Sequence, residues 1–174
     1  ESGPLIPRFS GPWLVSNRVL SLDYLWNEVR VKGGAYGCMS AFGRTGNAYF
    51  VSYRDPHLGR TNHVYNGIPT YLEHFTVSDR DMTKYIIGTI SDLDVPLTPQ
   101  AAGSRSLHAY ISHVTDEMVQ QERDQILDAG QEDIRALAPM VRCVLDQNYL
   151  CVVGSEGKLK KQSDLFARTE KLAE

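Results

Sequence analysis

The chain has 174 residues, 42% of them hydrophobic and 22% charged, which is typical of a globular protein with one domain-sized core. A net charge of −3 and a pI near 6.0 argue against nucleic acid as a partner, because such a partner needs a basic surface. No stretch approaches the ~20 apolar residues that span a bilayer, so no membrane partner is expected. The one basic cluster is interpreted as a solvated helix face: Lys158, Lys160 and Lys161.

The cysteines point to a reducing compartment. There are three of them, Cys38, Cys143 and Cys151, and their spacings match neither a C-x-x-C pair nor a zinc finger. Cys38 and Cys151 stand in apolar stretches and are interpreted as small core residues. Unpaired cysteines of this kind are typical of proteins that are not exposed to oxidising conditions.

The N-terminal third predicts a tail, a helix and a hairpin. Residues 1–11 are expected to be a tail or linker, and residues 12–174 a single domain. A helix should start at Pro12 and end at Gly33-Gly34, since proline suits the first turn and glycine the C-terminal cap. Its predicted buried face consists of Val15, Val19, Leu22, Trp26 and Val29. Two extended stretches, residues 35–42 and 49–53, flank a turn at residues 43–47 and predict a β-hairpin.

The remainder predicts mainly helices. One should follow the cap Asp55-Pro56, with an interruption at Gly67 and Pro69. Further helices should follow the capping residues Ser78, Thr98 and Thr115. One more helix is expected across the apolar positions Ile134, Leu137, Ala138, Val141 and Leu145. A short apolar strand is predicted at residues 149–153, followed by a charged segment that is helical or frayed. The fold class is therefore α+β, an antiparallel sheet with helices packed on one face.

The stretch Thr70-Tyr71-Leu72-Glu73-His74 is a near match to a zinc-peptidase motif. Inverted zinc peptidases use H-x-x-E-H on a helix, where two histidines bind the metal. Here the first position is Thr70, and a catalytic zinc needs three protein ligands. Glu73 and His74 are adjacent, so they point about 100° apart on a helix. They are interpreted as a surface glutamate and a helix-end histidine, and no metal site is predicted in this chain.

Arg30 and Tyr36 are the strongest candidates for chemistry. No G-x-S-x-G, P-loop or G-x-G-x-x-G motif occurs. Arg30 in the last helical turn could simply offset the negative helix end, and Tyr36 could be a core strand residue. Alternatively, both project from the Gly33-Gly34 corner toward one point. There, the guanidinium and the phenol would donate hydrogen bonds to a peptide carbonyl and stabilise its developing oxyanion.

Three segments resemble the last domain of presequence-protease-type enzymes, which belong to the pitrilysin/insulysin family of zinc metallopeptidases. They read LSLDYLWNEVRVKGGAYG, FVSYRDPHL and MTKYIIGTISDLD. The specific elements are R-V-x-G-G-A-Y-G and Y-R-D-P, and the similarity runs in order over residues 13–159. The resemblance implies a pitrilysin-like domain, one of four related domains that enclose a chamber in two halves.

The resemblance also implies roles for particular residues. Zinc and the catalytic glutamate belong to the first domain, which is absent here, so zinc is a cofactor of the full-length enzyme only. The last domain supplies an arginine and a tyrosine that bind the substrate backbone, and these fall on Arg30 and Tyr36. Gly33 and Gly34 would let that backbone approach closely. The implied partners are an unstructured peptide and the other domains of the same protease, in the bacterial cytoplasm or the mitochondrial matrix.

Two alternatives remain open. The chain could be a stand-alone, catalytically inactive domain that binds peptide or protein, in which Arg30 and Tyr36 bind peptide or only stabilise the fold. It could also be a small zinc hydrolase built around His74. Under the leading hypothesis, this chain alone is inactive.

Overall fold

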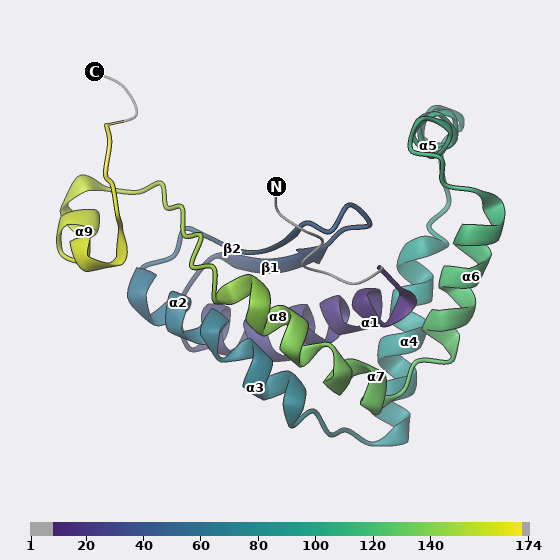
Figure 1. Ribbon diagram of the computed structural model, residues 1–174, viewed down its shortest axis with the longest axis horizontal. Coiled ribbons are helices and arrows are strands. Elements are labelled where there is room, and N and C mark those ends of the chain that lie inside the picture. Colours follow the sequence, from purple (N-terminus) through teal and green to yellow (C-terminus); the bar gives the residue numbers. More distant parts are fainter. Residues whose placement is uncertain (1–8, 172–174) are drawn as a thin grey trace.

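The computed structural model describes residues 9–171, a layer of helices with one β-hairpin on top (Figure 1). The first half contains α1 (Gly11–Val19), the π-helical turns η1 (Leu20–Tyr24) and η2 (Trp26–Val31), β1 (Gly37–Phe42), β2 (Ala48–Tyr53), α2 (Leu58–Asn66) and α3 (Ile68–Glu73). The second half contains α4 (Asp79–Leu93), α5 (Pro99–Ile111), α6 (Asp116–Leu127), α7 (Gln131–Ala136), α8 (Ala138–Leu145), α9 (Glu156–Lys160) and the 3-10 turn η3 (Ser163–Leu165). The predicted α+β class is confirmed. None of the described helices is long and apolar enough to cross a membrane.

The first helix begins at Gly11, one residue before the predicted start, and its second half is π-helical. Residues 1–8 of the predicted tail lie outside the described part of the chain. Three members of the predicted buried face are fully buried: Val15, Val19 and Val29. The prediction is wrong at Leu22 and Trp26, which are 54% and 43% exposed, while Leu20 and Leu25 are buried instead. The reason is the wider π-helical turn, which closes i→i+5 hydrogen bonds and rotates later side chains away from the 3.6-residue pattern.

The predicted hairpin is confirmed. Strands β1 and β2 are antiparallel and pair from Gly37–Tyr53 to Phe42–Ala48. Its inner face packs on the first helix, where the rings of Phe42 and Trp13 lie 4.7 Å apart between centroids. The Ser40 hydroxyl on the same face donates a 2.6 Å hydrogen bond to the amide oxygen of Asn17. These contacts fix the hairpin on α1 and so fix the position of the corner before β1.

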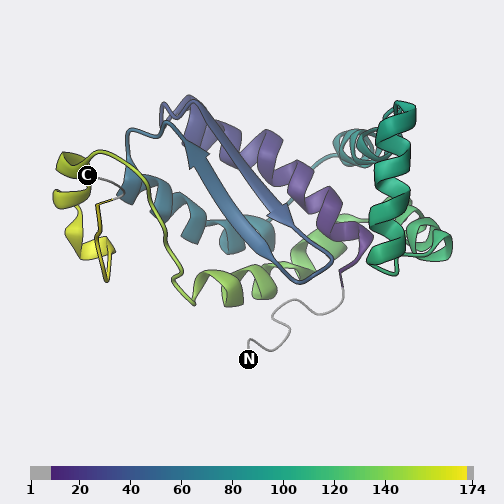
Figure 2. The same cartoon turned by 90° about the horizontal axis from the view of Figure 1, so that it is seen from above.

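The outer face of the hairpin is open. Helices lie only beneath it in Figure 1, and no element of residues 9–171 crosses it when it is viewed from above (Figure 2). Its outward side chains are exposed and mostly aromatic or apolar: Met39, Tyr49, Val51 and Tyr53. The helices therefore pack on one face of the sheet, as predicted, although the sheet in the described chain has only two strands.

The predicted helix caps are largely confirmed. The backbone N–H groups of Asp81, Ala101 and Met118 donate to the hydroxyls of three cap residues, Ser78, Thr98 and Thr115. The break near Gly67 is also confirmed, since it separates α2 from α3. Asp55 does not cap α2: its carboxylate accepts a 2.8 Å hydrogen bond from the His57 N–H, and the helix starts only at Leu58.

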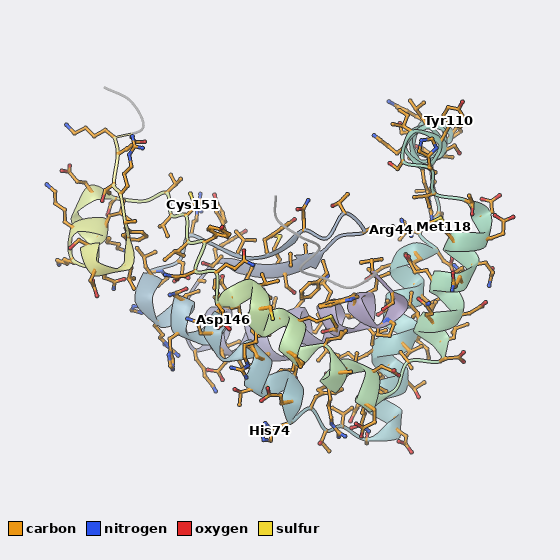
Figure 3. All side chains as sticks on the ribbon, viewed as in Figure 1. Arg44, His74, Tyr110, Met118, Asp146 and Cys151 are labelled. Atoms are coloured by element: carbon orange, nitrogen blue, oxygen red, sulfur yellow. The ribbon has the colours of Figure 1, made fainter. Side chains whose placement is uncertain are left out.

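Three predictions in the C-terminal third are wrong. The helix expected across Ile134 to Leu145 is two helices. The first ends at Ala136 and the second begins at Ala138, because Pro139 cannot donate a backbone hydrogen bond to the preceding turn. The strand expected at residues 149–153 does not form. Tyr149 is 91% exposed, and Cys151, predicted to be a core residue, is also exposed (Figure 3). An apolar run becomes a strand only beside a partner strand, and no described strand lies next to it.

Candidate functional site

The corner between η2 and β1 needs both of its glycines. A Cβ on Gly33 would lie 2.3 Å from the Val29 carbonyl oxygen, so no larger residue fits there without moving the helix backbone. Gly34 has a φ of +76°, a region that favours glycine. The Gly34 N–H then donates to the Arg30 carbonyl at 2.9 Å, and the Ala35 N–H donates to the Val29 carbonyl at 3.2 Å. The corner is thus a helix C-cap that turns the chain directly into β1.

Arg30 lies in the last turn of η2 and is held against an aromatic ring. Its guanidinium carbon is 3.9 Å from the centroid of the Trp26 ring, one turn earlier in the same helix. The π-helical turn places Trp26 at the surface, and there its ring contacts the Arg30 guanidinium. A stacked guanidinium keeps its charge and its planar edge free for hydrogen bonds.

Tyr36 stands on the other side of the corner and belongs to an aromatic cluster. It is 66% exposed, so the interpretation as a core residue is wrong. Its ring meets that of Tyr53 edge to face, with centroids 5.9 Å apart. The guanidinium carbon of Arg54 lies 5.7 Å from the Tyr36 ring and 5.3 Å from the Tyr53 ring. The Tyr36 hydroxyl makes no hydrogen bond with any residue between 9 and 171, so it presents a donor to solvent.

The structure brings Arg30 and Tyr36 to the same end of the hairpin. The positive charge of Arg30 acts on the thiol of Cys38, two residues after Tyr36. Burial raises the pKa of that thiol, the Arg30 charge opposes this rise, and the Asp55 carboxylate adds to it. Within the described chain, no hydrogen bond joins Arg30 to Tyr36. The corner therefore carries a cation on its helix side and an exposed phenol on its strand side.

Two buried polar atoms lie beneath this corner. The Asp55 carboxylate oxygen Oδ2 and the Tyr65 hydroxyl are both buried, and neither has a hydrogen-bond partner in the described chain. Tyr65 packs against Phe50 on the inner face of the hairpin, with ring centroids 5.8 Å apart. Burial raises the pKa of Tyr65 to about 12; the nearby Ser52 hydroxyl opposes this rise, and the negative charge of Asp55 adds to it.

We expect this tyrosine to make the fold sensitive to alkali. Between pH 10 and pH 12 the unfolded chain ionises Tyr65 while the folded chain keeps it neutral, so stability is lost as the pH rises. Tyr65→Phe should therefore reduce the loss of unfolding free energy between pH 8 and pH 11 by about 1 kcal/mol. Urea unfolding at both pH values measures this, with the exposed Tyr49→Phe as the matched control. Equal losses in Tyr65→Phe and the unsubstituted chain would contradict it.

The residues described do not form a zinc site. No group of three His, Cys, Asp or Glu side chains between residues 9 and 171 is placed to hold a metal ion. In the near-match segment, the His74 Nδ1 lies 2.9 Å from the Thr70 carbonyl oxygen, and Glu73 accepts a 3.0 Å hydrogen bond from Arg142. Figure 3 shows His74 at the lower edge of the molecule, on the opposite side from the hairpin.

Sequence reasoning missed three neighbours of the site: Trp26, Tyr53 and Arg54. Trp26 was assigned to the buried face of the first helix. Tyr53 and Arg54 stand in the Y-R-D-P element, and its resemblance to the family together with R-V-x-G-G-A-Y-G is the signal that could have found them. Only the antiparallel pairing, which places Tyr53 opposite Gly37, brings that element next to Tyr36.

Comparison with known proteins gives one consistent family. The family described as the PreP C-terminal domain matches residues 8–156. Protein HypA of Clostridium perfringens is 46% identical over 159 residues, covering 91% of this chain and 16% of that protein. Presequence protease 1, chloroplastic/mitochondrial, of Arabidopsis thaliana is 37% identical over 146 residues, covering 83% of this chain and 14% of that protein. The mitochondrial presequence protease of Aspergillus fumigatus is 30% identical over 157 residues, covering 90% of this chain and 14% of that protein.

The match therefore extends over most of this chain but only a small part of each relative. The chain spans 16% or less of the length of these three proteins. The matched region includes the whole corner, from Arg30 to Tyr36, and the hairpin that follows it. The chain belongs to the family of PreP C-terminal domains.

Proposed function

We propose that this chain is the C-terminal, substrate-binding part of a zinc metallo-oligopeptidase that degrades unstructured peptides. The observation that carries the proposal is the family match over residues 8–156, together with relatives named presequence proteases. A pitrilysin-like architecture for the assembled protein belongs to the same proposal. The chain's small share of each relative leaves ample room for the other domains that this architecture needs.

The proposed role of the corner is to hold the carbonyl of the peptide bond that is cleaved. Arg30, stacked on Trp26, would donate from its guanidinium, and Tyr36 would donate from its free hydroxyl. Such donors stabilise the negative charge that develops on the carbonyl oxygen. Gly34 is exposed and would let the substrate backbone pass close to the chain. Gly33 is buried and packed on its own helix, so it would act by shaping the corner.

The other requirements of the activity would be met outside this chain. Zinc would be bound by another domain of the full-length protein, where it supplies an activated water. The partners would be the peptide substrate and those other domains. The relatives named chloroplastic or mitochondrial favour an organelle, and the Clostridium relative favours a bacterial cytoplasm.

The proposal is tested by comparing this chain with the full-length protein that contains it. After dialysis against a weak chelator, elemental mass spectrometry should find near-zero zinc in the chain and about one zinc in the full-length protein. A quenched fluorescent peptide without stable structure should be cleaved only by the full-length protein. About one zinc per isolated chain, with cleavage, would overturn the proposal in favour of a small zinc hydrolase.

A second candidate function is a stand-alone domain that binds peptide or protein without cleaving it. The observation that favours it is the open, aromatic outer face of the hairpin. The reading frame that encodes the chain discriminates the two. An upstream domain with an H-x-x-E-H motif in the same frame supports the peptidase, and a start codon directly before Glu1 supports the binding domain.

A further inference from the structure

A cavity of about 300 Å³ lies where the tip of the hairpin meets α1, α4, α5 and α6, far along the hairpin from the Arg30 corner. Its apolar wall consists of Phe9, Leu14, Phe42, Leu93 and Val119. An adjoining hollow of about 280 Å³ shares Phe9, Arg44 and Glu122 with it and continues along α6 past Met118. Figure 3 shows Arg44 at the hairpin tip close to Met118 at the start of α6. Together they form a groove with one apolar end.

An ion pair between an exposed arginine and a buried glutamate is built into the wall of this cavity. The Glu122 side chain is only 9% exposed, and its Oε2 accepts hydrogen bonds from Arg44 Nε at 3.0 Å and Nη2 at 2.6 Å. A buried carboxylate requires a positively charged partner, and Arg44 supplies it. The Arg44 charge is therefore neutralised by Glu122. The pair fixes the hairpin tip to α6 and adds no net charge to the cavity.

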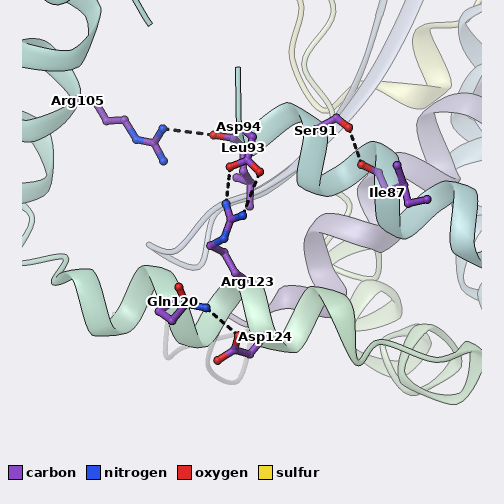
Figure 4. A network of polar contacts seen from close by, with 8 residues as sticks. All are labelled: Ile87, Ser91, Leu93, Asp94, Arg105, Gln120, Arg123 and Asp124. Carbon is purple, nitrogen blue, oxygen red and sulfur yellow. Dashed lines mark hydrogen bonds and ion pairs between the residues drawn. The ribbon is translucent and has the colours of Figure 1, made fainter. Parts of the chain in front are cut away.

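Two further arginines enter the cavity, and they differ in their partners (Figure 4). Arg123 forms two hydrogen bonds with the Asp94 carboxylate, at 2.5 and 3.0 Å, and is neutralised. Arg105, on α5, reaches only the Leu93 carbonyl oxygen, at 3.4 Å. Among the residues described, no carboxylate pairs with Arg105. The charge of Arg105 also acts on the Asp94 carboxylate, so Arg105 and Arg123 share one carboxylate and leave one net positive charge beside the apolar wall.

We propose that this cavity binds an apolar carboxylic acid, with its aromatic or branched group against Leu14, Phe42 and Leu93 and its carboxylate on Arg105. The volume is at the lower limit for small-molecule sites and suits one large side chain. The guanidinium geometry matches a carboxylate, and its weak contact with Leu93 is easily replaced. The groove along α6 would accept residues that precede a C-terminal one, so a peptide C-terminus is one source of this acid and a free acid is the other. This site does not depend on the peptidase activity.

The proposal is tested by isothermal titration calorimetry on the purified chain. N-acetyl-L-phenylalanine should bind, and its amide should bind at least about 10-fold more weakly, because the amide lacks the charge that Arg105 pairs with. A pentapeptide of four alanines and a C-terminal phenylalanine distinguishes the sources. Tighter binding of the pentapeptide identifies a peptide C-terminus, and equal binding identifies a free acid.

Variants test whether binding depends on Arg105 in the cavity or only on the overall positive charge of the chain. Arg105→Gln should weaken binding about 10-fold, while Arg80→Gln, at another exposed arginine, on α4, should leave it unchanged. Val119→Phe places a ring in the cavity and should abolish binding, with circular dichroism confirming that each variant is folded. Equal binding of acid and amide, or unchanged binding in both Arg105→Gln and Val119→Phe, would overturn the proposal.

Discussion

Arg30→Ala or Tyr36→Phe in the full-length protein is expected to lower kcat/KM for an unstructured peptide by ~10²–10³-fold, the usual effect of losing one donor to a developing oxyanion. The effect should fall mainly on kcat, because such donors act more strongly on the transition state than on the bound substrate. The geometry supports two separate contributions. Arg30 is oriented by Trp26, whereas Tyr36 is oriented by Tyr53 across the hairpin. Steady-state kinetics with a quenched fluorescent peptide measures both variants.

Matched controls test whether the effect belongs to the corner. Tyr49→Phe removes an exposed phenol from the same hairpin, and Arg80→Ala removes an exposed arginine from α4. Both should retain full activity, and all four variants should unfold at the same temperature. Full activity in both Arg30→Ala and Tyr36→Phe would show that the corner has no part in catalysis. Equal losses in the controls would show that the effect is not specific to it.

Gly33→Ala should be the most destabilising single substitution at the corner, with a loss of about 3 kcal/mol in the free energy of unfolding. The added Cβ would lie 2.3 Å from the Val29 carbonyl oxygen and 3.0 Å from that of Glu28. These are backbone atoms of η2, which cannot turn away as a side chain does. The last helical turn would have to open, and the hydrogen bonds that the Gly34 and Ala35 N–H groups donate to the Arg30 and Val29 carbonyls would weaken. Urea unfolding measures the loss.

Two neighbouring glycines provide the comparison. Gly37→Ala should be neutral or slightly stabilising, since a Cβ there meets nothing within 4 Å. Gly34→Ala should cost about 1 kcal/mol, because its φ of +76° strains an alanine although the space is open. If Gly33→Ala were as stable as Gly37→Ala, Gly33 would have no structural role, and its place in the corner would have to come from substrate contact instead.

Local features of this protein follow from the sequence because they depend on neighbours in the chain. The helix caps accept hydrogen bonds from backbone N–H groups three residues later in the chain; the cap residues are Ser78, Thr98 and Thr115. The two hairpin strands are joined by a short turn that lies between them in the sequence. The Gly33-Gly34 corner is also a local feature. Both glycines are required by the end of the helix directly before them, Gly33 for space and Gly34 for its positive φ. These elements need no distant partner, so their residue types are sufficient to predict them.

Other features were decided only by the tertiary structure. The π-helical turns bury Leu20 and Leu25 in place of Leu22 and Trp26, because packing outweighs the regular period of the helix. The apolar segment at residues 149–153 has no regular secondary structure, because a strand requires a partner that it does not meet in the described chain.

The surroundings of the two sites also depend on distant contacts. Tyr53 reaches Tyr36 only through strand pairing, and Arg105 enters its cavity only because α1, α4, α5 and α6 come together beside the hairpin tip. The sequence by itself determined the corner, its caps and its two candidate donors, since those depend on residues within a few positions of one another. The aromatic neighbours of the corner and the arginine-lined cavity join residues many positions apart, and only long-range packing determines which of them meet.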